Sequence, residues 1–164
     1  MSKSQTIKDP LASIIQDDSS MQYLTFSLAN EYYGVEILRV QEIKAWQEVT
    51  HIPNAADYLC GVFNLCGQIV PLVDLRLLFA MPRRVYTPRT VVVILQVKGE
   101  TERTVAIIVD EVSAAYDVMP EDIKSSPDFG RHIDTRFISG LVSIDNAMLI
   151  LLDIDILLSV EALG

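Results

Sequence analysis

Long apolar runs are missing from this sequence, although half of its 164 residues are hydrophobic. The longest uninterrupted apolar stretch is AMLILL at 147–152, far short of the roughly 18 residues that a membrane-spanning helix needs. The apolar residues are therefore expected to form a core or an interface. The chain length suits one ordinary domain, or two very small ones that share a core.

Cysteine and positive charge are also scarce. Two cysteines do not make a disulfide framework, and the N-terminal stretch has no apolar segment typical of a secretory signal, so we expect a cytoplasmic protein. Residues 1–20 are expected to form a flexible tail. With 13 basic and 22 acidic residues the net charge is −9, which argues against binding to nucleic acid. Arg83, Arg84 and Arg89 cluster in a proline-flanked segment that we interpret as a solvated or partner-facing loop.

Motifs of catalysis and metal binding are absent as well. His51 and His132 are far apart, and Cys60 and Cys66 have no second cysteine pair, so a zinc site is not expected. Neither the glycine-rich nucleotide motifs nor a G-x-S-x-G nucleophile motif occurs. We therefore expect a protein that is not an enzyme and that binds no cofactor.

Two aspartates that follow apolar runs, Asp74 and Asp153, allow two interpretations. Two carboxylates that share one proton are the catalytic pair of aspartic proteases. That chemistry requires small residues immediately after each aspartate, whereas bulky residues follow both here. Each aspartate is better explained as the N-cap of a short helix, where it accepts from free backbone N–H groups.

The residues present in abundance are those of β-strands: Val, Ile, Leu, Thr and Tyr in short runs broken by Gly, Asn, Asp and Pro. Strands are predicted at 22–28, from 34, and at 62–65, 69–73, 90–97 and 103–112, with a turn at 29–33 and a hairpin turn at Cys66–Gly67. Pro71 lacks a backbone donor, so its strand is expected to be an edge strand or to be bulged there. Short helices are predicted after Asp74, after Asp153 and over 37–43, and a long loop with a helical turn over 119–136.

The sequence also contains an internal repeat. GVFNLCGQIVPLVDLRLLF (61–79) aligns without a gap with GLVSIDNAMLILLDIDILL (140–158), so that Asp74 matches Asp153. The order strand pair, hairpin and short helix thus occurs twice, and one copy of about 70 residues is the size of a small SH3-like barrel. We predict an all-β fold of two such barrels packed in one compact unit, burying together the apolar faces that neither could bury alone.

Several of these segments are familiar. LCGVFNLCGQIVPLVDLR (59–76), together with QYLTFSLANEYYGVEILRVQEI (22–43), IVDEV (108–112) and MLILLDIDILL (148–158), resembles the CheW family of bacterial chemotaxis coupling proteins. The resemblance covers about residues 21–158. It implies two intertwined five-stranded SH3-like barrels that form one domain over residues 21–160. It also implies a non-catalytic adaptor that couples chemoreceptors to the regulatory domain of the histidine kinase CheA in receptor arrays.

The resemblance also implies two groups of contact residues. Receptor contact would fall at Val40, Glu42, Gly61, Cys66, Gly67 and Val91. A kinase-facing patch would fall at Lys124, Asp128 and Phe129. An apolar groove suits the stripes of a receptor helix bundle.

The departure from the family is Cys66, where an arginine is usual. The loss of that arginine removes any pairing with a nearby carboxylate such as Glu42, unless Arg39 or Arg76 substitutes for it. This departure makes an accessory coupling protein for a subset of receptors an alternative. A thiol-based redox-sensing module that uses Cys60 or Cys66 is another, and an aspartic hydrolase is the third.

Overall fold

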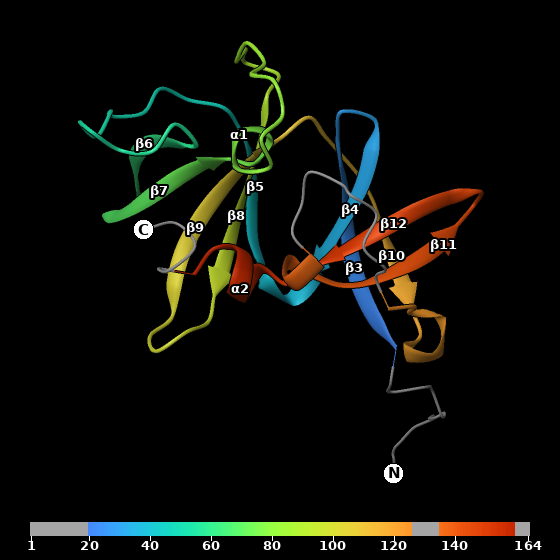
Figure 1. Cartoon of the computed structure of the whole chain (residues 1–164). Helices are drawn as coiled ribbons and strands as arrows, with labels where there is room; N and C mark the ends of the chain where they lie inside the picture. Colours follow the sequence, from blue (N-terminus) through green and yellow to red (C-terminus); the bar gives the residue numbers. More distant parts are fainter. Residues whose placement is uncertain (1–19, 126–134, 160–164) are drawn as a thin grey trace.

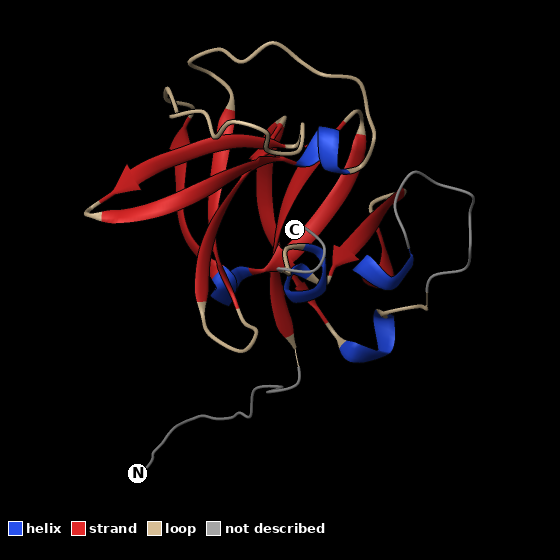
Figure 2. Cartoon of the chain, turned by 60° about the vertical axis from the view of Figure 1, so that its left-hand side comes forward, coloured by secondary structure: helices blue, strands red, loops and turns tan. Residues whose placement is uncertain are grey.

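The computed structural model describes residues 20–125 and 135–159 of the chain. They form two five-stranded sheets, which lie side by side in Figure 1, and only short helical segments (Figure 2). The predicted all-β fold with two SH3-like units is confirmed. In chain order, the elements are β3 (Met21–Leu28), β4 (Glu31–Glu36), η1 (Ile37–Arg39), β5 (Val40–Ala45), β6 (Leu59–Leu65), β7 (Gln68–Asp74), α1 (Leu75–Leu78), β8 (Val91–Val97), β9 (Arg103–Val109), β10 (Glu111–Val118), η2 (Pro120–Asp122), η3 (Thr135–Phe137), β11 (Ile138–Ile144), β12 (Ala147–Leu152) and α2 (Ile154–Leu157).

Each sheet takes strands from both copies of the repeat. The first sheet has the order β10-β3-β4-β12-β11, and the second has the order β5-β8-β9-β7-β6. The chain therefore leaves the first sheet after β4, builds the second sheet from β5 to β9, and returns with β10. The repeat alone suggested one barrel per copy. The structure instead divides each copy between the two sheets.

The core has three parts, which follow from the alternation of side chains along the strands. In β8 and β9, alternate residues such as Val93 and Ile107 face a central core shared by both sheets, and their neighbours Ile94 and Ala106 face the interior of the second sheet. A smaller cluster around Tyr23, Val142 and Leu151 fills the first sheet. Both faces of β8 and β9 are buried, which explains why the sequences of these strands are nearly continuous apolar runs.

The two hairpins of the repeat superimpose in register as well as in sequence. The β6–β7 pair has a register shift between Leu59 and Gly61, and the β11–β12 pair has the same shift between Ile138 and Gly140. The turn residues Cys66 and Gly67 have φ values of 51° and 88°, and the matching Asp145 and Asn146 have 49° and 67°. Positive φ at both central residues is the geometry of the tight turn that suits a twisted hairpin.

Both aspartates cap short helices, as predicted. Asp74 Oδ1 accepts hydrogen bonds from the backbone N–H groups of Arg76 and Leu77 at the start of α1. Asp153 Oδ1 accepts from the N–H of Ile156 in α2. The two carboxylates lie on different sheets and carry separate structural roles.

Two ion pairs lie at the points where the chain changes sheet. Arg39, at the end of η1, donates to both carboxylate oxygens of Asp155 in α2 at 2.7 and 2.6 Å. Arg76 in α1 donates to both oxygens of Asp110, the residue between β9 and β10, at 2.8 and 2.6 Å. Arg76 and Asp155 occupy the same position of the repeat, so the two pairs are related with the charges exchanged. Each ion pair links a short helix of the repeat, α1 or α2, to a segment in which the chain passes from one sheet to the other.

Several local predictions need correction. The strand that contains Pro71 is internal in its sheet, so the edge-strand alternative is wrong, and the register shift of the hairpin lies next to it, opposite Leu72 and Val73. Pro71 is tolerated because its pairing partner Val62 directs both backbone groups to Thr50, and the parallel pairing of β7 with β9 begins only at Leu72. The turn between the first strands contains only Ala29 and Asn30, so residues 31–33 belong to β4.

Two predictions of helix and loop are also refined. The predicted helix over 37–43 ends at Arg39, and β5 follows it because Val40 pairs with Leu95 of β8. The loop over 119–136 contains the helical turn η2, followed by a backbone bridge between Lys124 and Leu141. Residues 126–134 lie outside the described part of the chain, as do residues 1–19 of the predicted tail.

Candidate functional site at the polar end of the second sheet

A row of polar side chains crosses the second sheet at one of its ends. Gln68 of β7 and Gln96 of β8 both donate to Thr104 Oγ1 of β9, at 3.0 and 2.9 Å. Gln96 also donates to the side chain of Gln41 in β5. The row therefore joins the β6–β7 turn to β5 across the intervening strands. It forms the polar end of an interior that is otherwise apolar.

Four of the six predicted receptor residues flank this polar row. Val40 and Glu42 lie in β5 on either side of Gln41, and Cys66 and Gly67 form the turn that precedes Gln68. Glu42, Cys66 and Gly67 are exposed, and Val40 is half-buried against the central core. The β6–β7 and β8–β9 hairpins both extend toward the left side of the molecule in Figure 1.

The other two predicted receptor residues lie at the opposite end of the sheet. Val91 begins β8 opposite Ala45, and Gly61 pairs with Leu72 next to the register shift. Gly61 is buried, with a φ of +151°, and a Cβ there would lie 2.3 Å from the Thr50 carbonyl oxygen. Its glycine is therefore required by the close approach of segment 46–58, whereas the space beside Gly67 is open.

Neither candidate substitute for the family's arginine is available to Glu42. Arg39 is held by Asp155, and Arg76 is held by Asp110, so both guanidinium groups have carboxylate partners elsewhere. The exception named in the sequence analysis, that Arg39 or Arg76 takes over this pairing, therefore does not apply. The position of Cys66 contributes a small, exposed thiol in place of a cation.

Of the predicted kinase residues, only Lys124 is described. Its side chain is exposed and its backbone pairs with Leu141 at both N–H and C=O. Lys124 lines a groove of about 750 Å³ together with Tyr116, Asp122 and Met148, between the edge strands of the first sheet. Asp128 and Phe129 lie outside the described residues.

A network that the sequence did not predict lies at the end of the second sheet opposite the polar row. Tyr86 donates a hydrogen bond to Asp74 Oδ2, and Cys60 Sγ lies 3.2 Å from the same hydroxyl. The Tyr86 ring stacks on Trp46 with ring centroids 5.7 Å apart. Burial and the bond to Asp74 raise the pKa of Tyr86 above its usual value, and burial raises the pKa of Cys60. The only sequence signal was a single tyrosine within the proline-flanked arginine segment.

Within residues 20–125 and 135–159, no three His, Cys, Asp or Glu side chains come together as metal ligands. No helix in those ranges is both long and apolar enough to cross a bilayer.

Comparison with known proteins identifies the family. A family model described as the CheW-like domain matches residues 22–162. The chain belongs to the CheW family. It is 42% identical over 143 residues to the chemotaxis protein CheW of Klebsiella aerogenes, covering 87% of this chain and 84% of that protein. It is 33% identical over 151 residues to the CheW of Treponema pallidum, covering 90% and 87%.

A solved CheW structure supports the same assignment. The crystal structure of the scaffolding protein TtCheW from Thermoanaerobacter tengcongensis superimposes with a TM-score of 0.76 at 29% identity, covering 87% of this chain and 90% of that chain. The present protein is thus a CheW-family chemotaxis adaptor in sequence and in fold. The CheW domain contains both the polar end of the second sheet and the Tyr86 network.

Proposed function

We propose that this protein couples chemoreceptors to the regulatory domain of the histidine kinase CheA, without catalysis or cofactor. The match of the CheW-like domain over residues 22–162 carries the proposal. The absence of a catalytic constellation in the sequence supports a role in assembly. The protein would act in the cytoplasm and be recruited to receptor arrays at the membrane.

The receptor would bind at the polar end of the second sheet, through Val40, Glu42, Cys66 and Gly67. Support comes from the common position of these residues around the row of Gln41, Gln96, Thr104 and Gln68. Gly61 and Val91 would act indirectly, because they set the packing at the opposite end of the strands. Polar rows at the rim of an interface fix orientation, and an exposed apolar residue such as Ile69 supplies area for contact.

The kinase would bind through Lys124, Asp128 and Phe129, of which the described Lys124 lies beside the first sheet. The groove that Lys124 lines supports this placement, since it combines apolar walls with acidic and basic side chains. Separate sheets for the two partners would let one copy of the adaptor hold both at once.

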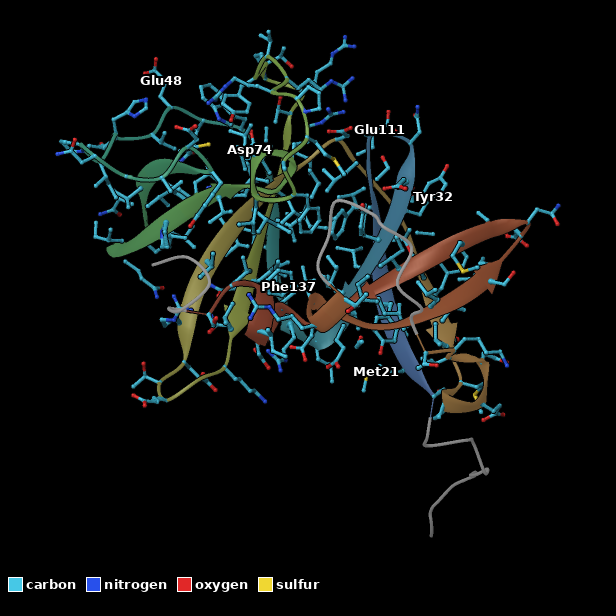
Figure 3. The ribbon with its side chains drawn as sticks, in the orientation of Figure 1. Met21, Tyr32, Glu48, Asp74, Glu111 and Phe137 are labelled. Atoms are coloured by element: carbon cyan, nitrogen blue, oxygen red, sulfur yellow. The ribbon has the colours of Figure 1, made fainter. Side chains whose placement is uncertain are left out.

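A binding assay with purified components tests the proposal. The full chain should bind both a receptor signalling fragment and the CheA regulatory domain of the same organism. Glu42→Lys should weaken receptor binding about tenfold with kinase binding unchanged, because it reverses a charge at the proposed contact. Glu48→Lys is the matched control, since Glu48 is also exposed but lies in the segment after β5 (Figure 3). Binding of the folded protein to neither partner would overturn the proposal.

An accessory role, limited to a subset of receptors, is the second candidate. The observation that favours it is Cys66, whose missing charge no neighbouring arginine replaces. The thiol-sensor alternative receives less support, because Cys60 is buried and its pKa is raised by burial, which is the opposite of an activated thiolate.

A further inference from the structure

The arginine loop, residues 82–89, is held firmly although it projects from the molecule. Tyr86 anchors it through the bond to Asp74 and the stack on Trp46. The N–H of Thr87 donates to Thr90 Oγ1, and the N–H of Trp46 donates to the Thr90 carbonyl, which fixes the end of the loop to β5. A surface that is already ordered loses little entropy when a partner binds.

The anchored loop exposes an apolar side chain among cations. Val85 is 84% exposed, the highest value for a large apolar residue in the described part of the chain. Arg83, Arg84 and Arg89 surround it in sequence and are all exposed. Within the described residues, neither Arg83 nor Arg89 forms an ion pair, and Arg84 lies 3.1 Å from an Asp110 oxygen that Arg76 already holds. Their guanidinium donors are thus largely available.

Two clefts lie on either side of Tyr86. Arg84 and Arg89 line one of about 320 Å³, together with the Arg76–Asp110 pair, Asp74 and Glu111. Arg83 lines the other, of about 710 Å³, with Ile52 and Pro53 and with the acidic side chains of Glu48 and Asp57. The arginine loop therefore presents apolar surface and cationic groups that face two open depressions.

The charge of the whole chain makes this surface distinctive. The net charge is −9, so most of the molecule repels an acidic partner, and the arginine loop is where such a partner would be attracted. Arginine suits carboxylates because its planar fork can donate two parallel hydrogen bonds.

We propose that the arginine loop and the cleft lined by Arg84 and Arg89 form a docking surface for an acidic segment of a partner protein, with carboxylates on either side of an apolar side chain. The apolar side chain would cover Val85, and the carboxylates would pair with Arg84 and Arg89. The surface lies away from the polar end of the second sheet, so it is separate from the proposed receptor site.

Photo-crosslinking of the full chain in its own cells tests the proposal. Val85 is replaced by p-benzoylphenylalanine, which the exposure of this position should tolerate, and the crosslinked peptide is sequenced. The expected product is a segment of another protein with acidic residues around the crosslinked site. Arg84→Gln/Arg89→Gln should lower the yield about tenfold, as expected for the loss of two exposed ion pairs.

The matched control removes two positive charges elsewhere. Lys44→Gln/Lys98→Gln changes the net charge equally and should leave the yield unchanged. An equal loss in both variants would show a general charge effect and overturn the proposal. A crosslinked segment without net negative charge, an adduct with a second copy of this chain, or the absence of any protein adduct would also overturn it.

Discussion

At the scale of single residues, Asp74 combines two structural roles, and its repeat partner Asp153 shares only one of them. One carboxylate oxygen caps α1 and the other accepts from Tyr86, and the residue is only 1% exposed. Asp153 makes one capping bond of 3.2 Å and is half-buried. The local motif predicts the cap, because capping depends on neighbouring residues. It cannot predict the tyrosine, which reaches Asp74 only through the path of the arginine loop.

The two caps should therefore differ in their contribution to stability. Asp74→Ala should lower the free energy of unfolding by about 2–3 kcal/mol, since it removes a cap and takes the carboxylate acceptor away from the Tyr86 hydroxyl. Asp153→Ala should cost about 1 kcal/mol. Urea denaturation of both variants measures the difference. Equal losses would show that the Tyr86 bond adds nothing.

Cys66 is the residue at which receptor affinity is expected to respond most directly. Cys66→Arg should strengthen binding of a receptor signalling fragment by about tenfold, because a charge-assisted hydrogen bond to a nearby carboxylate becomes possible. Cys66→Ala, which adds no charge, should leave the affinity unchanged. The exposed turn has room for the longer side chain. Unchanged binding by the arginine variant would argue against the accessory role.

At the scale of elements, the bulged hairpins depend on glycine for different reasons. A Cβ at Gly61 would meet the backbone oxygen of Thr50, and the φ of +151° strains any other residue. A Cβ at the matching Gly140 would lie 2.2 Å from Ile123 Cγ2, the end of a side chain that can rotate. The first contact cannot be relieved without moving the segment that closes the second sheet.

Alanine at the two positions should separate these effects. Gly61→Ala should lower the free energy of unfolding by about 3 kcal/mol or more, and Gly140→Ala by about 1–2 kcal/mol. Denaturant midpoints give both values. If Gly61→Ala also weakened receptor binding, the loss should scale with stability, because Gly61 is buried. Weaker binding without any loss of stability would instead indicate direct contact.

Most of these elements could be predicted from the sequence, but their pairing could not. The alternation in β3 and the turn at Cys66–Gly67 depend on neighbouring residues, so a local pattern is sufficient to predict them. The short η1 segment has helical spacing, and the strand after it is decided by Val40 meeting Leu95, more than fifty positions away. Likewise, Val40, Glu42 and Cys66 come to one end of the sheet only through the intervening β7, β9 and β8. Tertiary contacts of this kind leave no local pattern.

At the scale of the whole molecule, the Arg39–Asp155 and Arg76–Asp110 ion pairs link the free energy of unfolding to pH. Hydrogen bonding to Arg39 lowers the pKa of Asp155. Burial would raise the pKa of Asp110, but its bonds from Arg76 and the Ala29 N–H outweigh burial and lower it. Because both folded-state pKa values are lowered, the stabilisation is complete above the unfolded value of about 3.9 and is lost as the pH falls through the folded values.

Replacing one of these carboxylates should make the free energy of unfolding depend less on pH in the acid range. Asp110→Asn should cost about 2 kcal/mol near neutral pH and progressively less as the pH falls below the unfolded value of about 3.9 and then through the lower folded value. Asp155→Asn should show the same trend with a smaller amplitude, since its side chain is 31% exposed against 11% for Asp110. Urea titrations at several pH values measure both curves. A loss that stays constant with pH would show that the carboxylate charge is not involved.

Because the chain changes sheet after β4 and again after β9, a single copy of the repeat would complete neither sheet. The first copy, for example, provides the β3–β4 hairpin of the first sheet. It also provides β5 and the β6–β7 hairpin of the second sheet. The molecule therefore has the architecture of a strand-exchanged homodimer whose two subunits are fused into one polypeptide, with residues 80–90 as the fusion joint. Cleaved within that joint, the two halves would hold each other in place, and neither would fold without the other.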